Sequence, residues 1–573
     1  MRAPFQAVFG AASAFLDRSR RLRAIDLALL VALGGAAFGV VRLAQRWTGA
    51  YHPAVEIDLS LSALPRYTLL SLSRGLAAYA LSLLFTLGYG YWAAKDRVAE
   101  KVLIPLLDIL QSVPVLGFMP SVVLALVAAF PTSNVGLELA AVVMIFTGQA
   151  WNMAFSYYHS LRTLPANLGE VGTLYRFGAW RRLRWVELPY AANGLVWNSM
   201  MSMAGGWFFL MVSEAFVLGD HDFRLPGLGS YMSVAAARGD GFAMAASVAA
   251  MTILIVVLDQ LVWRPLVVWA QKFRVEESGQ TEPMRSWFYD LLRRSRLGEA
   301  VSAYRERLFV RARAPSAPAR PRRRPSGALS LVLFAALVAL LVAGAAAMAG
   351  LLRTVDLAAW GELGLAAALT LVRVLAAVAL GTLWALPAGL AIGLTPRLSR
   401  VLQPVVQVVA SFPAPMLFPA VIVGLRALGV TLGFGSVVLM LLGTQWYILF
   451  NVVAGATSIP ADLREAARLF AFTPWQRFRT LYLPAVFPHL VTGWVTAAGG
   501  AWNASIVAEY VSSSGSVLTT RGLGAIISDA AGRGRFGVLA AAVTVMALVV
   551  VAFNRLVWRR LHALGEERFS LSR

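Results

Sequence analysis

The chain of 573 residues is too long for one small domain, and 58% of its residues are hydrophobic whereas only 14% are charged. This composition, with a mean hydropathy of +0.67, is typical of integral membrane proteins. The net charge of +22 therefore indicates a charge bias across a membrane rather than nucleic-acid binding.

Apolar segments near the ~20 residues that a helix needs to cross a bilayer occur in two sets of six. The sequence places them at 25–45, 68–94, 103–130, 136–158, 190–218 and 241–269, and again at 328–352, 364–395, 402–426, 431–456, 485–511 and 537–558. The first segment follows a cluster of arginines and lacks a small-residue cleavage site, so we expect a retained helix. Pro105, Pro114 and Pro120 interrupt segment 103–130, which is therefore either a kinked span or a pair of short helices.

The two sets of segments are copies of one unit of about 240 residues. At a constant offset of 299, an arginine and three prolines of the first set match the second: Arg74 with Arg373, Pro105 with Pro404, Pro114 with Pro413 and Pro120 with Pro419. At an offset of 295, further residues match: Glu170 with Glu465, Pro189 with Pro484, Trp207 with Trp502 and Glu214 with Glu509. Six spans per copy predict parallel repeats, since the second copy then enters the membrane in the orientation of the first.

Positive charge predicts the orientation of these spans. If both termini are cytoplasmic, most of the 51 Lys and Arg residues face the cytoplasm. We accordingly divide the chain into an N-terminal basic segment with the first helix and a periplasmic loop, a first repeat, a cytoplasmic linker, the first helix of the second repeat, the second repeat and a cytoplasmic tail, at 1–67, 68–270, 271–327, 328–362, 363–562 and 563–573.

The linker at 271–327 is rich in proline and has more than twice as many basic as acidic residues. Residues 283–311 would form a surface helix with Trp287, Phe288 and Leu291 on its apolar side. That helix is a candidate lipid-binding element, and an ordinary solvated linker is the alternative.

Two polar segments, Leu164–Pro189 and Ser458–Pro484, lie between the fourth and fifth spans of each copy. Each contains a proline near its start, a glutamate, a tryptophan and a closing Leu-Pro pair. A short helix across the end of a bundle, with proline before and after it, is shaped to press on another protein. We interpret the segments as coupling elements, and amphipathic loops without a partner are the alternative.

Glu465, Ala466 and Ala467, followed by Ala471 and then by Leu483-Pro484, resemble the EAA loop of binding-protein-dependent ABC importer permeases. In that family the pattern is EAA, three residues, Gly, nine residues, a hydrophobe, one residue and Leu-Pro. The spacing here fits throughout, with Ala471 at the glycine position.

The first copy departs from this pattern. Glu170, Val171 and Gly172 replace EAA, Arg176 stands at the glycine position and Pro189 closes the loop. The resemblance implies that both loops contact ATPase subunits, through two different surfaces.

The resemblance covers nearly all of both copies. A set of second-copy residues resembles nitrate/sulfonate/taurine-type permeases in duplicated, fused form: Arg373, Pro404, Ser411–Pro415, Trp502, Glu509 and Gly522–Gly524. It implies an all-α type I ABC importer fold in the bacterial cytoplasmic membrane, and small anions or organic acids as substrates. It also implies two cytoplasmic ATPase subunits that bind ATP and Mg, and a periplasmic or lipoprotein substrate-binding protein.

Several kinds of site are missing from the sequence. There is no GxxxxGK[ST], so this chain does not hold ATP in a P-loop, and we expect a permease that is not itself an enzyme. The lack of cysteine excludes thiolate ligands and nucleophiles, and the five histidines have no HxxxH or HxH spacing. We therefore predict no metal and no cofactor in this chain, and membrane lipid rather than nucleic acid around it.

Polar residues inside apolar segments are costly in lipid and usually face the bundle interior or a cavity. The substrate-path candidates are Arg74, Gln111, Ser112, Trp207, Glu214, Arg373, Ser411, Gln445, Trp502, Asn503 and Glu509. An arginine on the path would suit an anion, whereas an interhelical Glu–Arg pair that fixes packing is the alternative we favour. Asn503 matches Phe208 in the first copy, so we expect an asymmetric path.

A secondary transporter of the major facilitator type is the main rival, because it also joins two parallel six-span halves by a basic linker. Its loop signature, an acid four residues after a glycine, fails here since Asp96 lies six residues after Gly90. A membrane enzyme is disfavoured because no cluster of histidines and carboxylates marks a catalytic site. An exporter permease would carry its own ATPase and no EAA loop. The ATP-driven importer is therefore our working hypothesis.

Overall fold

The computed structural model describes residues 56–112, 114–175, 177–218, 221–273, 285–295, 327–513 and 516–569. The expected first helix at 25–45, Arg176 and most of the linker at 271–327 lie outside these residues. The chain divides into two compact units, which are described separately. The smaller consists of residues 1–46, 165–196 and 257–322, and the larger of residues 47–164, 197–256 and 323–573.

The first copy contributes a series of helices and one hairpin to the larger unit. They are η2 (Leu61–Ala63), α3 (Leu64–Lys95), α4 (Arg97–Ser112), η3 (Val115–Gly117), α5 (Met119–Ala129), α6 (Val135–Arg162), the second part of α9 (Leu188–Glu214), β1 (Val217–Leu218), β2 (His221–Asp222), α10 (Leu228–Arg238) and most of α11 (Gly241–Leu258).

The second copy lies wholly in the larger unit. Its elements are α15 (Gly327–Leu352), α16 (Leu357–Leu394), α17 (Pro396–Ala410), η7 (Ala414–Leu417), α18 (Phe418–Ala427), α19 (Leu432–Thr457), α20 (Ala461–Leu469), α21 (Pro474–Arg477), η8 (Phe478–Tyr482), α22 (Leu483–Ala508), β3 (Tyr510–Ser513), β4 (Ser516–Thr519), α23 (Leu523–Gly532), α24 (Phe536–Phe553), η9 (Asn554–Trp558) and α25 (Arg559–Phe569).

The smaller unit holds the first polar segment, from Pro165 on, and the end of the first copy. Its described elements are α7 (Ala166–Leu174), α8 (Ala179–Arg182), η4 (Leu183–Glu187), the start of α9, η5 (Asp259–Trp263), α12 (Arg264–Ala270), η6 (Gln271–Phe273) and α13 (Trp287–Arg294). Taken along the chain, the elements from α3 to α12 recur in the same order from α16 to α25, including a π-helical turn before each fifth span. The duplicated sequence therefore folds twice into the same series.

Eight helices among the described residues are long and apolar enough to cross a membrane. A ninth span results if α17 and the stretch Ala414–Ala427 count together, and these two are bent by 79°. The expected count of twelve is therefore not confirmed within the described residues. The bend arises because Pro413, like Pro114 in the first copy, takes an extended conformation (ψ 112° and 116°) and ends the preceding helix.

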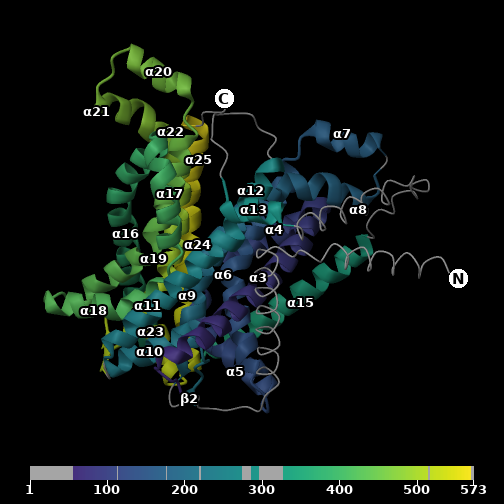
Figure 1. Cartoon of the computed structure of the whole chain (residues 1–573). Helices are drawn as coiled ribbons and strands as arrows, with labels where there is room; N and C mark the ends of the chain where they lie inside the picture. Colours follow the sequence, from purple (N-terminus) through teal and green to yellow (C-terminus); the bar gives the residue numbers. More distant parts are fainter. Residues whose placement is uncertain are drawn as a thin grey trace, which may run out of the picture. The chain divides into compact units, whose positions relative to one another are not determined.

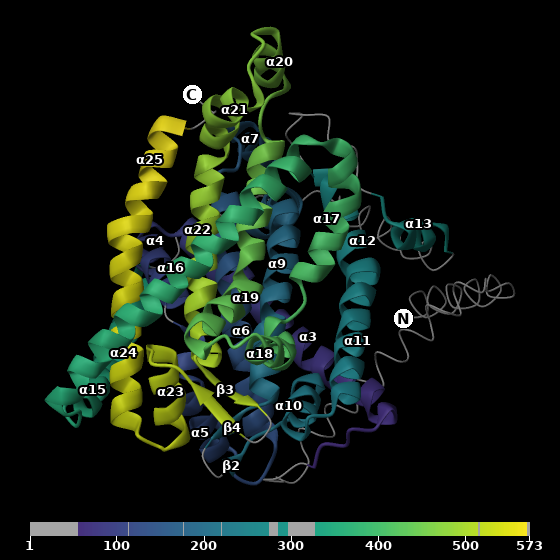
Figure 2. The same cartoon turned by 90° about the vertical axis from the view of Figure 1, so that its left-hand side faces the viewer.

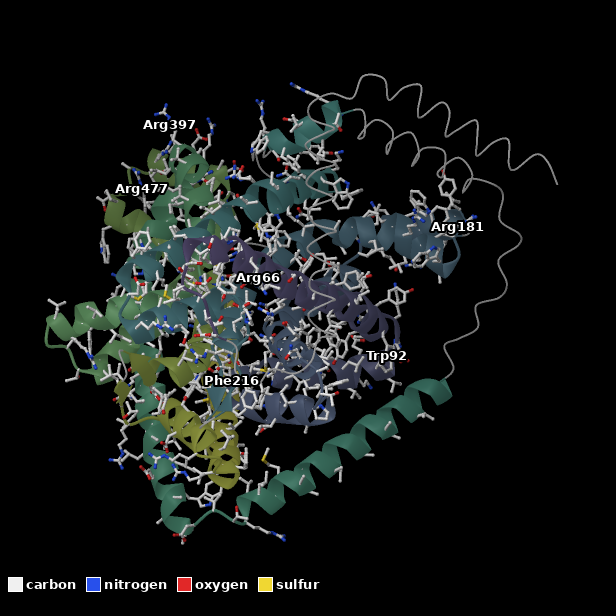
Figure 3. The ribbon with its side chains drawn as sticks, turned by 60° about the horizontal axis from the view of Figure 1, so that its bottom comes forward. Arg66, Trp92, Arg181, Phe216, Arg397 and Arg477 are labelled. Carbon is white, nitrogen blue, oxygen red and sulfur yellow. The ribbon has the colours of Figure 1, made fainter. Side chains whose placement is uncertain are left out.

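Two opposite ends can be distinguished in the larger unit. Figures 1 and 2 show α20 and α21 at one end, and α10, α23 and the strands at the other. Arg397, at the start of α17, and Arg477, in α21, lie at the α20 end, whereas Phe216, just after α9, lies away from it (Figure 3). We call the first end the loop end and the second the hairpin end.

At the hairpin end, each copy has a short antiparallel hairpin. In β1–β2, Val217 pairs with Asp222, and in β3–β4, Tyr510 pairs with Thr519. The two copies contact one another reciprocally here, since α10 contacts β3 and α23 contacts β1. Such reciprocal contacts are expected for two repeats that are related by a pseudo-two-fold axis along the membrane normal.

The core of the second copy depends on small residues where helices meet. A Cβ added to Gly389 of α16 would lie 2.6 Å from a methyl carbon of Val452, and one added to Gly393 would lie 2.5 Å from the Cβ of Ala456, both in α19. Helices in lipid associate through such close packing, because lipid tails provide no hydrophobic driving force between them.

Candidate functional site

A cavity of about 300 Å³ lies between the two copies in the larger unit. Its polar lining consists of amides and hydroxyls: Gln111, Thr147, Asn152, Gln407, Ser411, Thr444, Thr496, Asn503 and Asn554, with the phenol of Tyr447. The other aromatic lining residues are Trp151, Phe208, Phe209, Phe412, Trp446, Phe450, Trp502, Phe553 and Trp558. None of the described lining residues is a Lys, Arg, His, Asp or Glu. The cavity is thus aromatic, polar and uncharged.

Four of the substrate-path candidates line this cavity, namely Gln111, Ser411, Trp502 and Asn503. Ser112 ends α4, and its side chain lies outside the described part of the structure. The lining does not include Trp207, which is buried against Gly75, or Gln445, whose Oε1 accepts a hydrogen bond of 3.0 Å from the indole N–H of Trp384.

Asn503 joins the two copies at the cavity wall. Its Oδ1 accepts a hydrogen bond of 2.8 Å from the backbone N–H of Val115, the first residue of η3. Its Nδ2 donates to the carbonyl oxygen of Gly499 at 3.2 Å. Phe208, the matching residue of the first copy, lines the same cavity without a polar group. The lining of the cavity therefore differs between the two copies at this position.

The hydroxyls of the cavity donate to their own helices. Each of these hydroxyls donates a hydrogen bond to the carbonyl oxygen of a residue three or four positions earlier. The distances are 2.7 Å for Thr147, 2.8 Å for Ser411, 2.9 Å for Thr444 and 2.9 Å for Thr496. Because a hydroxyl has one hydrogen and two lone pairs, these groups are left as acceptors towards the cavity.

The charged candidates form two clusters near the hairpin end, away from the cavity lining. In the first, which we call node 1, Arg74 is fully buried and its Nη1 donates to Oε1 of Glu214 at 2.7 Å. Its Nε and Nη2 donate to the two oxygens of Glu138 at 2.6 and 2.8 Å. Glu214 also accepts from the hydroxyl of Ser71 at 2.8 Å and from the backbone N–H of Gly229 at 2.9 Å. Node 1 thereby ties α3, α6 and α9 to the start of α10.

Node 2 is the corresponding cluster of the second copy. Nη1 of Arg373 donates to Oε1 of Glu509 at 2.8 Å, and Glu509 accepts from the hydroxyl of Thr370 at 2.9 Å and from the backbone N–H of Gly524 at 2.9 Å. Nη2 of Arg373 donates to the hydroxyl of Thr520 at 3.0 Å. Node 2 has one carboxylate where node 1 has two.

Sequence reasoning singled out the Arg and Glu of each node but missed Ser71, Thr370 and Glu138. The first two carried a signal, since Ser71 and Thr370 match at the offset of 299 that relates Arg74 to Arg373. Glu138 has no acidic counterpart in α19, so the comparison of copies does not reveal it.

Helix α20, in the second polar segment Ser458–Pro484, ends in a Schellman motif. The N–H of Ala471 bonds to the carbonyl oxygen of Arg468 at 2.9 Å, and that of Phe472 to Ala467 at 3.1 Å. Ala471 is the one residue other than glycine with positive φ in the described parts of the chain, at 51°. This is the left-handed conformation that glycine adopts without penalty, which explains why a glycine is usual at this place in the motif.

The residues predicted to couple to an ATPase have matching positions in both loops. Glu170 and Glu465 are exposed, whereas the third residue of each triplet, Gly172 or Ala467, is buried. Of the remaining coupling candidates, Val171 is exposed, and Ala466, Pro189 and Pro484 are half-buried. Arg176 lies outside the described residues. The N–H of Phe177 bonds to the carbonyl oxygen of Gly172 at 2.8 Å, so α7 closes with the same long bond as α20.

Both loops expose large apolar side chains. Leu469, Phe470 and Trp475 are exposed in the second loop, as are Leu174, Tyr175 and Trp180 at the equivalent places of the first. Leu469 and Leu174 are 81% and 79% exposed. Matched apolar exposure on two otherwise polar segments is typical of a surface that binds another protein.

Asp222 and Arg224 form a further ion pair at the hairpin end. The guanidinium of Arg224 donates to both carboxylate oxygens of Asp222, and the backbone N–H of Arg224 donates to Oδ1 at 3.0 Å. Burial would raise the pKa of Asp222, but these hydrogen bonds and the charge of Arg224 outweigh it and lower the pKa. No group of three or more His, Asp or Glu in the described residues is arranged to hold a metal ion.

Comparison with known proteins agrees with the duplicated architecture. The family model described as "Binding-protein-dependent transport system inner membrane component" matches twice, over residues 86–262 and 377–562, which together exceed half of the chain.

Individual relatives are permeases of several importers. The chain is 29% identical over 184 residues to the nitrate import permease NrtB of Leptolyngbya laminosa, covering 31% of this chain and 62% of that protein. It is 25% identical over 185 residues to the taurine transport system permease TauC of Escherichia coli K12 (32% and 63%). It is 24% identical over 227 residues to the glycine betaine/proline betaine permease ProW of E. coli K12 (39% and 60%).

The matched stretch spans about three fifths of the length of these relatives. The double match assigns one family domain to each copy and argues against the major facilitator alternative. With its apolar spans, this chain belongs to the inner membrane components of binding-protein-dependent transport systems, as a duplicated ABC importer permease of the type I fold.

Proposed function

We propose that this chain is the permease subunit of an ATP-driven importer that moves a small anion or organic acid inward, with both halves of the pore in one chain. The observation that carries the proposal is the cavity, whose walls come from both family domains. The names of the relatives, which include nitrate, taurine and betaine permeases, support a small polar substrate.

In this proposal, two cytoplasmic ATPase subunits that bind ATP and Mg dock on the two EAA-like loops. The exposed apolar residues Leu469 and Leu174, with their aromatic neighbours, form the contact surfaces. The glutamates Glu465 and Glu170 stand exposed at the edge of each surface, while the buried third residue of each triplet keeps the short helix packed. Arg176 takes the glycine position of the first loop and Ala471 that of the second, so the two loops differ in sequence there.

The loop end is then cytoplasmic, together with both termini, and a substrate-binding protein docks at the hairpin end. Arg397 and Arg477 at the loop end agree with the excess of positive charge on cytoplasmic segments. Closure of the ATPases rocks the two copies so that the cavity opens alternately to each side. The hydrogen bond from Val115 to Asn503 crosses between the copies and must lengthen when they separate at this level.

The test is co-purification of the tagged chain with co-expressed candidate ATPase subunits. Charge reversal of both loops, Glu465→Arg with Glu170→Arg, should release the ATPases and abolish substrate-dependent ATP hydrolysis. Glu362→Arg, the same exposed charge change near the start of α16, is the matched control and should retain both. The coupling assignment is wrong if the double variant still binds ATPases and hydrolyses ATP in response to substrate.

A further inference from the structure

We propose that the cavity between the copies takes a small zwitterion, a molecule that carries an ammonium group beside its acid group and has no net charge. This inference rests on the proposed function and narrows the anion or organic acid named there. It follows from the charge, the aromatic surface, the hydrogen-bonding groups and the size of the cavity.

The charge of the lining disfavours a net anion. None of the described lining residues is charged, so an anion would lose its water without gaining a counter-ion. The two arginines that were candidates for binding an anion, Arg74 and Arg373, do not line the cavity. Their guanidinium groups already donate to Glu214 and Glu509. A zwitterion avoids this problem because its two charges partly compensate one another.

The aromatic walls suit the ammonium half of such a molecule. Trp446, Tyr447, Trp502 and Trp151 all line the cavity. The faces of aromatic rings attract cations, tryptophan most strongly, and this attraction grows when water is excluded. A nitrate or bicarbonate ion would gain nothing from these faces.

The polar groups of the cavity complement both halves of a zwitterion. The hydroxyls of Thr444 and Thr496 donate within their own helices, which leaves their oxygens as acceptors for an ammonium N–H or a polarised methyl group. The side-chain amides of Asn152 and Gln407 carry N–H groups that can donate to carboxylate or sulfonate oxygens.

The size of the cavity agrees with an organic molecule. Its volume of about 300 Å³ lies at the lower end of the range of about 300–1,000 Å³ that is usual for ligand pockets. An amino or methylated ammonium acid fills much of this space, whereas an inorganic anion of four atoms would leave most of it to water.

The experiment measures binding to the purified full chain in lipid nanodiscs by titration calorimetry, without ATPase or binding protein. Two pairs of probes differ only in the ammonium group: glycine betaine with its carbon isostere 3,3-dimethylbutyrate, and taurine with isethionate. Nitrate is the fifth probe. We expect at least one zwitterion to bind about tenfold more tightly than its anionic partner, as one desolvated contact of a cation with an aromatic face would give.

The proposal is overturned if nitrate or an anionic isostere binds as tightly as the zwitterions, or if no zwitterion binds at millimolar concentrations. Trp446→Leu should weaken zwitterion binding about tenfold and remove the preference over the isostere. Trp92→Leu, outside the cavity, is the matched control and should leave both unchanged. If Trp446→Leu does not fold, the relative affinity of the native chain for each zwitterion and its anionic isostere still tests the proposal.

The two proposals fail differently. If the wild-type chain does not associate with ATPase subunits, the proposal that it is an importer permease is wrong. A preference for nitrate in the nanodisc titration, with ATPase association intact, would speak against the zwitterion alone.

Discussion

Replacement of Arg74 by methionine tests whether node 1 is a packing element or part of the substrate path. The substitution keeps an unbranched side chain of similar length but removes the guanidinium that donates to Glu138 and Glu214. Both carboxylates would then remain buried without their cation, and the protein must either hydrate them or unfold locally. We therefore expect a large loss of stability.

The magnitude follows from the burial of the pair. Removing one partner of a buried ion pair costs about 3–5 kcal/mol. For a cooperative domain of the size of the first repeat, 68–270, each kcal/mol lowers the melting temperature by about 2–4 °C, so Arg74→Met should lower the apparent Tm by about 6–20 °C. Arg373→Met should cost less, since it leaves one carboxylate and its own side chain is already 13% exposed.

The assay is the apparent Tm of the detergent-solubilised chain, followed by size-exclusion chromatography. Adding Glu138→Gln and Glu214→Gln to Arg74→Met should restore more than half of the loss, because no uncompensated charge then remains buried. A wild-type Tm for Arg74→Met together with lost uptake would refute this reasoning and place Arg74 on the substrate path. A greater loss for Arg373→Met than for Arg74→Met would also contradict it.

Three further substitutions test local features of the structure. Gly522→Ala should destabilise the chain by about 1–3 kcal/mol, because the new Cβ would lie 2.2 Å from a carboxylate oxygen of Glu509 in node 2. The control is Gly424→Ala, whose new Cβ would have no atom within 4 Å, and it should be neutral or stabilising in the same thermal assay. Ala471→Gly should stabilise the end of α20 by up to about 1 kcal/mol. It relieves left-handed strain of about 1–2 kcal/mol, but part of this gain is lost because glycine makes the unfolded chain more flexible. Hydrogen exchange of the α20 amides should become slower, and faster exchange would contradict the prediction. The lowered pKa of Asp222 means that its pairing with Arg224 contributes stability above about pH 4, the ordinary value, and loses it as the pH falls through the pKa of the folded state. Asp222→Asn should therefore reduce, by up to about 1 kcal/mol, the loss of unfolding free energy between pH 6 and pH 3. The fall in Tm over this range should be shallower, and an unchanged pH profile would count against the pairing.

Sequence reasoning predicted the features that follow from the internal repeat or from the covalent structure of a single residue type such as proline. The duplication predicts the recurring order of elements, and the family model confirms two domains. Pro114 and Pro413 predict the interrupted helices, because proline lacks an N–H and restricts the residue before it. The Arg–Glu pairs follow from charges that match between copies and are too costly to leave alone in lipid.

The features that sequence reasoning missed depend on the meeting of distant segments. The neutral lining of the cavity arises where α4 and α6 meet α17, α19 and α22, and no single helix reveals it. Glu138 lies in an apolar helix without a counterpart in the second copy, so only its contact with Arg74 shows its role. The positive φ of Ala471 is a local feature, and its one signal in the sequence is the glycine that the family pattern has at this position.

The central claim is that two unequal loops of one chain each bind an ATPase subunit. The chain contains no cysteine, so single cysteines at Leu469 and at Leu174 permit site-specific cross-linking without background. We predict that each cysteine forms an adduct with an ATPase subunit in the assembled complex, and that a cysteine at Val517 in the hairpin does not. Absence of an adduct from both loops, in a complex that still hydrolyses ATP, would contradict the claim.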